Sequence, residues 1–197
     1  PSFLGFDTLP AHGALLVPGR LRHEDLLALA TKLAPRSLIW LVEETAMVDP
    51  ATQEYLNRED IRAVTFSQAD PDPTAIGKAL TDKIKDNSLM IFIPGDAAAR
   101  RGTACHIPPD LSAFLCELKL PTIPIAVSLP SELKLATESG SRLPSTIFAL
   151  GDMIPASEVT LPAYQENLLR ASESSFSSRT FLRESLSKHL LIGLKKH

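Results

Sequence analysis

The sequence predicts an α/β domain with a mixed, mainly parallel sheet flanked by helices. Short apolar runs alternate along the chain with segments in which apolar residues recur every three or four positions. Such alternation is typical of βαβ units, whose strands pair in parallel and whose helices cover the sheet. The chain has 197 residues, 44% of them hydrophobic and 22% charged, which suits one domain with a buried core.

The strands are expected where a short apolar run stops at turn-forming residues. The run Ala14–Val17 stops at Pro18 and Gly19, and the run Ser88–Ile93 stops at Pro94 and Gly95. By the same criterion we expect strands at 14–17, 37–42, 61–66, 88–93, 123–129 and 145–150.

The helices are expected where apolar residues fall on one face. In the first of them Leu26, Leu29 and Leu33 are in register, and Pro35 ends the helix. The full set of expected helices is 24–33, 50–56, 74–85 and 110–119.

The residue composition of the sequence changes after residue 161. Residues 171–179 are rich in Ser and charge and predict a loop or linker, and 181–194 have the leucine spacing of an amphipathic helix. We therefore divide the chain into a domain at 1–165 and a linker with a helix at 166–197. The chain begins at Pro1 and ends without a closing signal, so we expect it to be a piece of a longer protein.

Charge and composition exclude several classes of protein. The formal net charge of −3 provides no basic field for a nucleic acid. No apolar stretch approaches the roughly 20 residues that span a bilayer, and no signal peptide is visible, so we expect a soluble, cytoplasmic domain. Cys105 and Cys116 have neither zinc spacing nor a disulfide framework, and we expect reduced thiols and no metal.

In α/β sheets, ligands bind beyond the carboxyl ends of the strands. The first such end, 17–25, carries Arg20, His23 and Asp25. Asp25 is either catalytic or a helix-start acid that stabilises the dipole. His23 is either a base or an ordinary helix-start residue, and it does not face Asp25 if both are helical, since they are two residues apart.

The second strand end, 93–102, carries Gly95, Asp96, Arg100 and Arg101. The arginines are either a clamp for a phosphate or a solvated loop pair. Gly95 and Asp96 suggest a turn that approaches a phosphate. A further interpretation is a Rossmann-like binding module. The sequence after the first strand lacks the G-x-G-x-x-G fingerprint of such modules, which argues against it.

Taken in order, these segments resemble the glycerophospholipid acyltransferase family over roughly residues 10–155. The family's first motif, Asn-His-x-x-x-x-Asp at the start of a helix, reads here as Gly19-Arg20-x-x-x-x-Asp25, in which Asp25 alone matches. The second motif, a strand ending near an arginine, fits 61–66, but Ser67-Gln68 stand in the arginine's place.

The later motifs follow the same order. The third, Phe-Pro-Glu-Gly-Thr-Arg-Ser, reads here as 93–99, Ile-Pro-Gly-Asp-Ala-Ala-Ala, in which Pro94 alone matches. The fourth motif, a Val-Pro-x-x-Pro-Val-like strand, is matched closely by residues 120–125, Leu-Pro-Thr-Ile-Pro-Ile. The tail at 180–197 resembles the segment that joins such a domain to an acyl-activating synthetase domain.

The resemblance implies a glycerol-phosphate acyltransferase-like fold and transfer of a fatty acyl group to a lysophospholipid. It implies acyl-carrier protein or acyl-CoA as donor, no cofactor or metal, a C-terminal synthetase domain, and peripheral contact with the inner membrane. In the family the His is the base. Arg20 stands in its place and stays protonated, so we expect weak or lost activity. The alternative is a pseudoenzyme that binds lipid, acyl-carrier protein or a partner domain.

Overall fold

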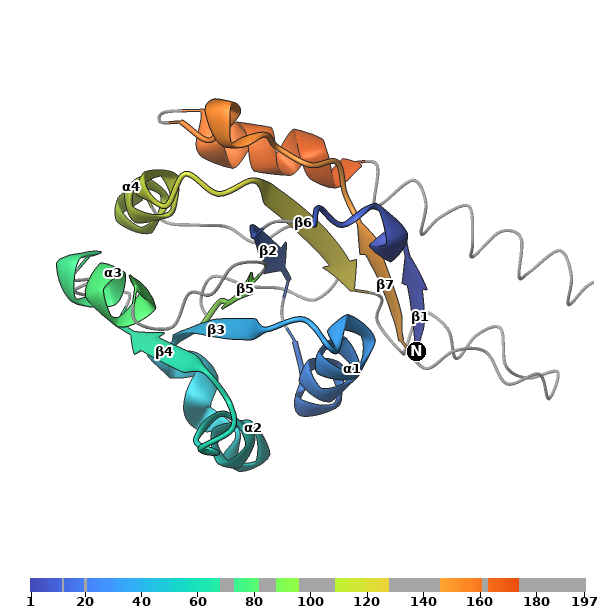
Figure 1. Cartoon of the computed structure of the whole chain (residues 1–197), viewed down its shortest axis with the longest axis vertical. Coiled ribbons are helices and arrows are strands. Elements are labelled where there is room, and N and C mark those ends of the chain that lie inside the picture. Colours follow the sequence, from blue (N-terminus) through green and yellow to red (C-terminus); the bar gives the residue numbers. More distant parts are fainter. Residues whose placement is uncertain are drawn as a thin grey trace, which may run out of the picture.

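The chain folds around one mixed sheet with helices on both faces (Figure 1). The computed structural model describes residues 1–11, 13–19, 21–67, 73–81, 88–95, 109–127, 146–160 and 163–173. Within these ranges the sheet has seven strands in the order β1-β7-β6-β2-β5-β3-β4. The α/β class expected from the sequence, with a mixed and mostly parallel sheet, is confirmed.

Each strand hydrogen-bonds to its neighbours in parallel except the pair β6 and β7, which is antiparallel. The central strands are buried on both faces, which explains why the sequence shows continuous apolar runs instead of alternation. The strands are β1 (Ser2–Leu4), β2 (Ala14–Pro18), β3 (Leu38–Glu43), β4 (Ala63–Phe66), β5 (Leu89–Ile93), β6 (Thr122–Val127) and β7 (Ile147–Leu150).

The helices divide between the two faces of the sheet. The α-helices are α1 (His23–Leu33), α2 (Pro50–Leu56), α3 (Pro73–Thr81), α4 (Pro109–Glu117) and a helical segment at 164–173. Short 3-10 turns are η1 (Phe6–Thr8), η2 (Glu44–Val48) and η3 (Ala156–Glu158). Core contacts place α1 and α2 on one face and α3, α4 and the segment 164–173 on the other (Figure 1).

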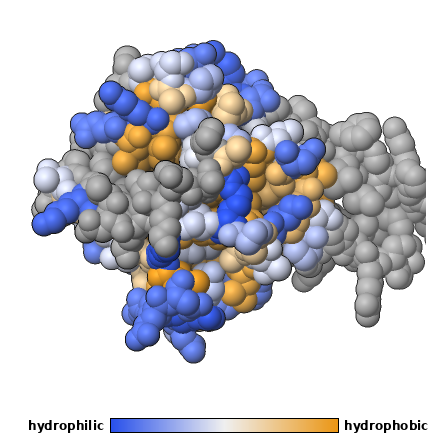
Figure 2. All heavy atoms as spheres, viewed as in Figure 1, coloured by the Kyte–Doolittle hydropathy of each residue, from blue (hydrophilic) through white to orange (hydrophobic). Residues whose placement is uncertain are grey.

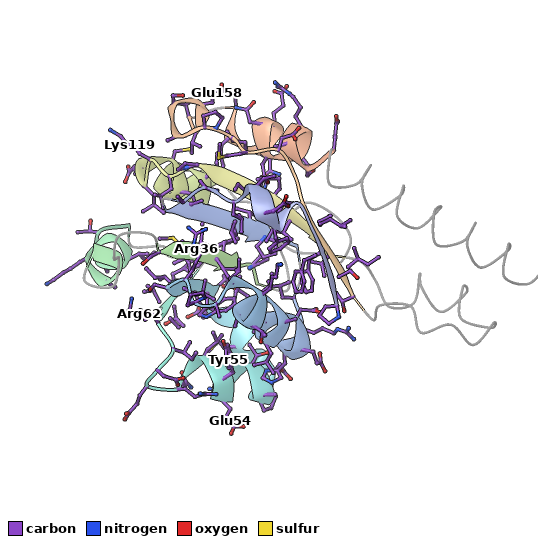
Figure 3. All side chains as sticks on the ribbon, turned by 45° about the vertical axis from the view of Figure 1, so that its right-hand side comes forward. Arg36, Glu54, Tyr55, Arg62, Lys119 and Glu158 are labelled. Atoms are coloured by element: carbon purple, nitrogen blue, oxygen red, sulfur yellow. The ribbon has the colours of Figure 1, made fainter. Side chains whose placement is uncertain are left out.

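Alternate side chains of each strand enter opposite cores, as the two-residue period of a strand requires. On β2, Leu15 packs with the α3 and α4 side, whereas Leu16 packs with the α1 and α2 side. On the latter side the rings of Trp40 and Tyr55 meet edge to face at 6.2 Å. Tyr55 lies on the sheet side of α2, whereas Glu54 points outward (Figure 3).

One expectation from the sequence is wrong. Residues 171–173, assigned to a linker, belong to the helical segment 164–173, and the domain boundary at 165 falls inside this helix. Tyr164, Leu168 and Ala171 are buried at helical spacing against the sheet, so packing overrides the polar composition. The rest of the expected linker and the amphipathic helix at 181–194 lie outside the described residues.

Hydrophobic and hydrophilic side chains alternate in small areas over the face shown in Figure 2. None of the helices in the described ranges combines the length and the apolar character needed to cross a membrane. Cys116 is a free, half-buried thiol, and Cys105 lies outside the described ranges.

Candidate functional site

A cavity of about 460 Å³ opens where three neighbouring parallel strands end. It lies between the start of α1, which follows β2, the η2 turn and start of α2, which follow β3, and the end of β5. Its lining residues are Leu21, Arg22, His23, Glu24, Leu26, Thr45, Ala46, Asp49, Ala51, Thr52, Ile93 and Pro94.

The strand order explains the position of this cavity. β5 lies between β2 and β3, although it follows both of them along the chain. The chain leaves β2 and β3 for helices on one face, whereas β5 is followed by α4 on the other face. Connections that diverge from adjacent strand ends leave a crevice, which is where α/β proteins bind ligands.

His23 is the first residue of α1 and lines the cavity. Its ring meets Tyr55 of α2 edge to face, with centroids 6.1 Å apart. Its Nδ1 atom is buried and has no hydrogen-bond partner among the described residues. Since buried polar atoms are nearly always paired, this nitrogen is a candidate to bind a ligand group.

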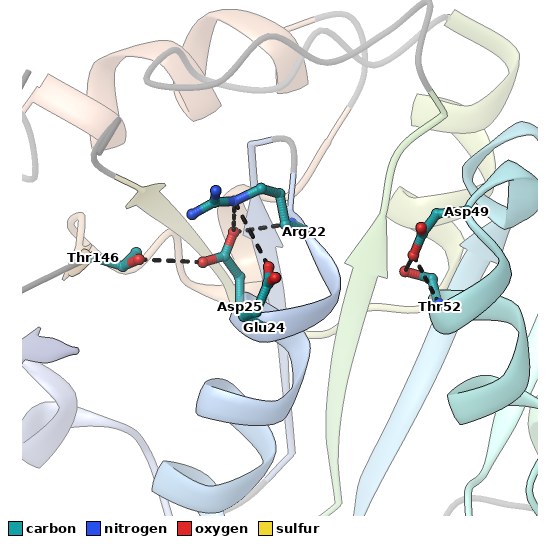
Figure 4. Close-up of polar contacts among 6 residues, drawn as sticks. All are labelled: Arg22, Glu24, Asp25, Asp49, Thr52 and Thr146. Carbon is teal, nitrogen blue, oxygen red and sulfur yellow. Dashed lines mark hydrogen bonds and ion pairs between the residues drawn. The ribbon is translucent and has the colours of Figure 1, made fainter. Parts of the chain in front are cut away.

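Asp49 provides a carboxylate to the same wall. It is the N-cap of α2, and its Oδ2 accepts hydrogen bonds from the Thr52 backbone N at 2.8 Å and from Thr52 Oγ1 at 2.7 Å (Figure 4). These two hydrogen bonds lower the pKa of Asp49, and the charge of His23 adds a smaller lowering. The cavity therefore holds an ionised carboxylate at neutral pH close to an imidazole.

Asp25 is directed away from the cavity. Its buried carboxylate accepts a hydrogen bond from the Arg22 backbone N at 2.9 Å and one from Thr146 Oγ1 at 3.4 Å (Figure 4). The Nε atom of Arg22 lies 3.8 Å from the same carboxylate. Asp25 therefore closes the first turn of α1 and connects it to the residue that precedes β7.

The two strand ends singled out in the sequence meet at this edge of the sheet, as far as the described residues extend. Residues 21–24 of the first segment and 93–94 of the second line the same cavity. Gly95 follows directly and is buried. Four predicted site residues, Arg20, Asp96, Arg100 and Arg101, lie outside the described ranges.

The segment 44–52 was missed as part of the site. It contributes Thr45, Asp49 and Thr52 to the cavity. Its local signal is the Asp49-Pro50 pair, in which an N-cap residue precedes a proline at the first helical position. That signal marks a helix start after a strand, the place where ligand-binding residues gather in this fold class.

Within the described ranges, no three His, Cys, Asp or Glu side chains come close enough together to hold a metal ion. Comparisons with protein-family models, with curated proteins and with solved structures gave no match for this chain.

Proposed function

We propose that this chain is an acyltransferase-like domain of phospholipid metabolism and that the cavity beyond β2, β3 and β5 is its substrate site. One observation carries the proposal. The segment after β2 and the segment after β5, which resemble the first and third acyltransferase motifs, line a single cavity. Leu21, Leu26 and Ile93 give this cavity an apolar wall suited to part of an acyl chain.

The proposed reaction is direct acyl transfer. A base removes the proton of the lysophospholipid hydroxyl, whose oxygen attacks the thioester carbonyl, and the thiolate leaves with the proton that the base returns. His23 lines the cavity and is the described residue suited to this role. The ionised carboxylate of Asp49 lines the same cavity as His23.

Weak activity is expected even so. Arg20 occupies the position of the family's histidine and stays protonated. His23 is the first helical residue, and Asp25 accepts hydrogen bonds from Arg22 and Thr146. Asp25 therefore does not orient the imidazole as the family's Asp does, and we expect only part of the factor on the order of 10²–10⁴ that general base catalysis contributes.

The arrangement of Asp25 also favours a second candidate, a non-catalytic domain that binds lipid, acyl-carrier protein or a partner domain. In that case the cavity retains its apolar wall and its size, but Asp25, which matches the family's catalytic Asp, only stabilises the fold. Binding of lysophospholipid without turnover would distinguish this candidate from the enzyme.

The test is acyl transfer from acyl-carrier protein or acyl-CoA to a lysophospholipid, with wild type, His23→Ala and the exposed-site control Asn57→Ala. We expect slow turnover that falls to background in His23→Ala and is unchanged in Asn57→Ala. Fast turnover that His23→Ala leaves unchanged would contradict the proposed site. Absence of turnover with intact lysophospholipid binding would favour the non-catalytic candidate.

A further inference from the structure

A buried carboxylate stands beside the cavity and has no part in the reaction described above. Glu43 is the last residue of β3, and 3% of its surface is exposed. Its Oε2 atom accepts a hydrogen bond from the Thr45 backbone N at 2.9 Å and another from Thr45 Oγ1. Thr45 in turn lines the cavity.

The same carboxylate packs on the backbone of Gly95, just beyond β5. A Cβ atom added at Gly95 would lie 2.7 Å from Cδ of Glu43, and it would lie closer still to Oε2 and to Thr45 Oγ1. Carbon atoms do not approach other heavy atoms so closely. A side chain at position 95 would therefore have to displace the carboxylate from both of its donors inside a buried site.

This contact joins two sides of the cavity wall. β3 and β5 are paired with Val42 opposite Ile93, so Glu43 comes opposite Pro94, and Gly95 lies one position farther along the chain. Thr45 lies on one side of the contact, and Ile93 and Pro94 lie on the other, and all three line the cavity.

We propose that Glu43 is a positioning residue of this site and that its carboxylate occupies the place a side chain at position 95 would take. The acid behind the wall at this point then comes from β3, whereas the acyltransferase pattern has its glutamate at position 95. What the cavity binds rests on the proposed function, but the pairing of Glu43 with Gly95 does not. One consequence is that Gly95→Glu is accommodated only when residue 43 is small.

The pairing is tested by unfolding wild type, Gly95→Ala, Glu43→Ala and the double variant in urea. We expect Gly95→Ala to lower the unfolding midpoint clearly in the wild-type background and much less in the Glu43→Ala background. The matched control is Glu44→Ala, an exposed neighbour that should leave the effect of Gly95→Ala unchanged. Equal losses in the Glu43→Ala and wild-type backgrounds would overturn the pairing.

The positioning role is tested with a short-chain lysophospholipid as the probe, titrated below its micelle concentration. We expect Glu43→Ala to weaken binding roughly tenfold, because this factor corresponds to the free energy of about one hydrogen bond. Glu43→Gln keeps the shape and an acceptor oxygen for Thr45, so it should bind like wild type. The swap Glu43→Ala with Gly95→Glu should recover most of the lost affinity.

The outcomes separate the two proposals. A wild-type protein that does not bind the probe contradicts the proposed function, while the unfolding comparison still decides whether Glu43 and Gly95 are paired. A wild type that binds, with a folded swap variant that does not recover affinity, would overturn the positioning role.

Discussion

His23 and Asp25 show how far the sequence determines a site at the scale of single residues. Both were expected near the start of the first helix, and both are there. Successive helical residues turn by about 100°, so residues two positions apart point in nearly opposite directions. His23 accordingly lines the cavity, whereas Asp25 is buried against Thr146. The distant partner of Asp25 could not be predicted, because 121 residues separate it from Thr146.

Replacement of Asp25 by alanine should destabilise the fold. The change removes the acceptor for the Arg22 backbone N and for Thr146 Oγ1 in a buried site. The expected loss in the free energy of unfolding is about 1–3 kcal/mol, measured by urea unfolding. The control is Glu24→Ala, whose side chain is 75% exposed and whose effect should stay within about 0.5 kcal/mol. Equal effects of the two substitutions would contradict this role.

At the scale of elements, the sequence predicted the strands and helices whose burial is visible in the local pattern of apolar residues. Apolar runs located β2, β3, β5 and β6 because a strand buried on both faces has little polar alternation. β1 was missed because it has three half-buried residues at the sheet edge. The helix at 164–173 was missed because its buried face depends on packing against the sheet, which local composition does not reveal.

The two faces of α1 give a direct check on its packing. Leu29 is fully buried under the sheet, whereas Leu27 is 40% exposed on the same helix. Leu29→Ala should lower the free energy of unfolding by about 2–5 kcal/mol, because it leaves a cavity in the core. Leu27→Ala should cost much less in the same urea titration. A reversed order would show that α1 is rotated from the orientation described here.

The N-cap of α2 should depend on pH. The Thr52 hydrogen bonds hold the pKa of Asp49 below 3.8, its ordinary value. A carboxyl whose pKa is lowered on folding contributes stability above its unfolded pKa and loses that stability as pH falls through its folded pKa. Between pH 7 and pH 3, wild type should therefore lose more stability than Asp49→Asn, as measured by urea midpoints. An identical loss in both proteins would contradict the assignment.

At the scale of the whole molecule, the site results from strand order. The sequence indicated which segments are strands and which strand ends carry polar residues, but local periodicity does not determine which strands become neighbours. The insertion of β5 between β2 and β3 brings Pro94 to the cavity that His23 and Thr45 also line. This long-range pairing creates the cavity, and it also creates the contact between Glu43 and Gly95.

The most direct test of the central claim is to fill the cavity. Ala51 lines it from the exposed first turn of α2, so Ala51→Phe should obstruct the space without disturbing the core. The control, Ala75→Phe, places the same ring at an exposed position of α3 on the other face. We would measure the dissociation constant of a short-chain lysophospholipid. We predict binding by wild type and by Ala75→Phe, and binding at least about tenfold weaker by Ala51→Phe, a loss of about 1.4 kcal/mol. Equal binding by all three proteins would contradict the claim that this cavity is the lipid site.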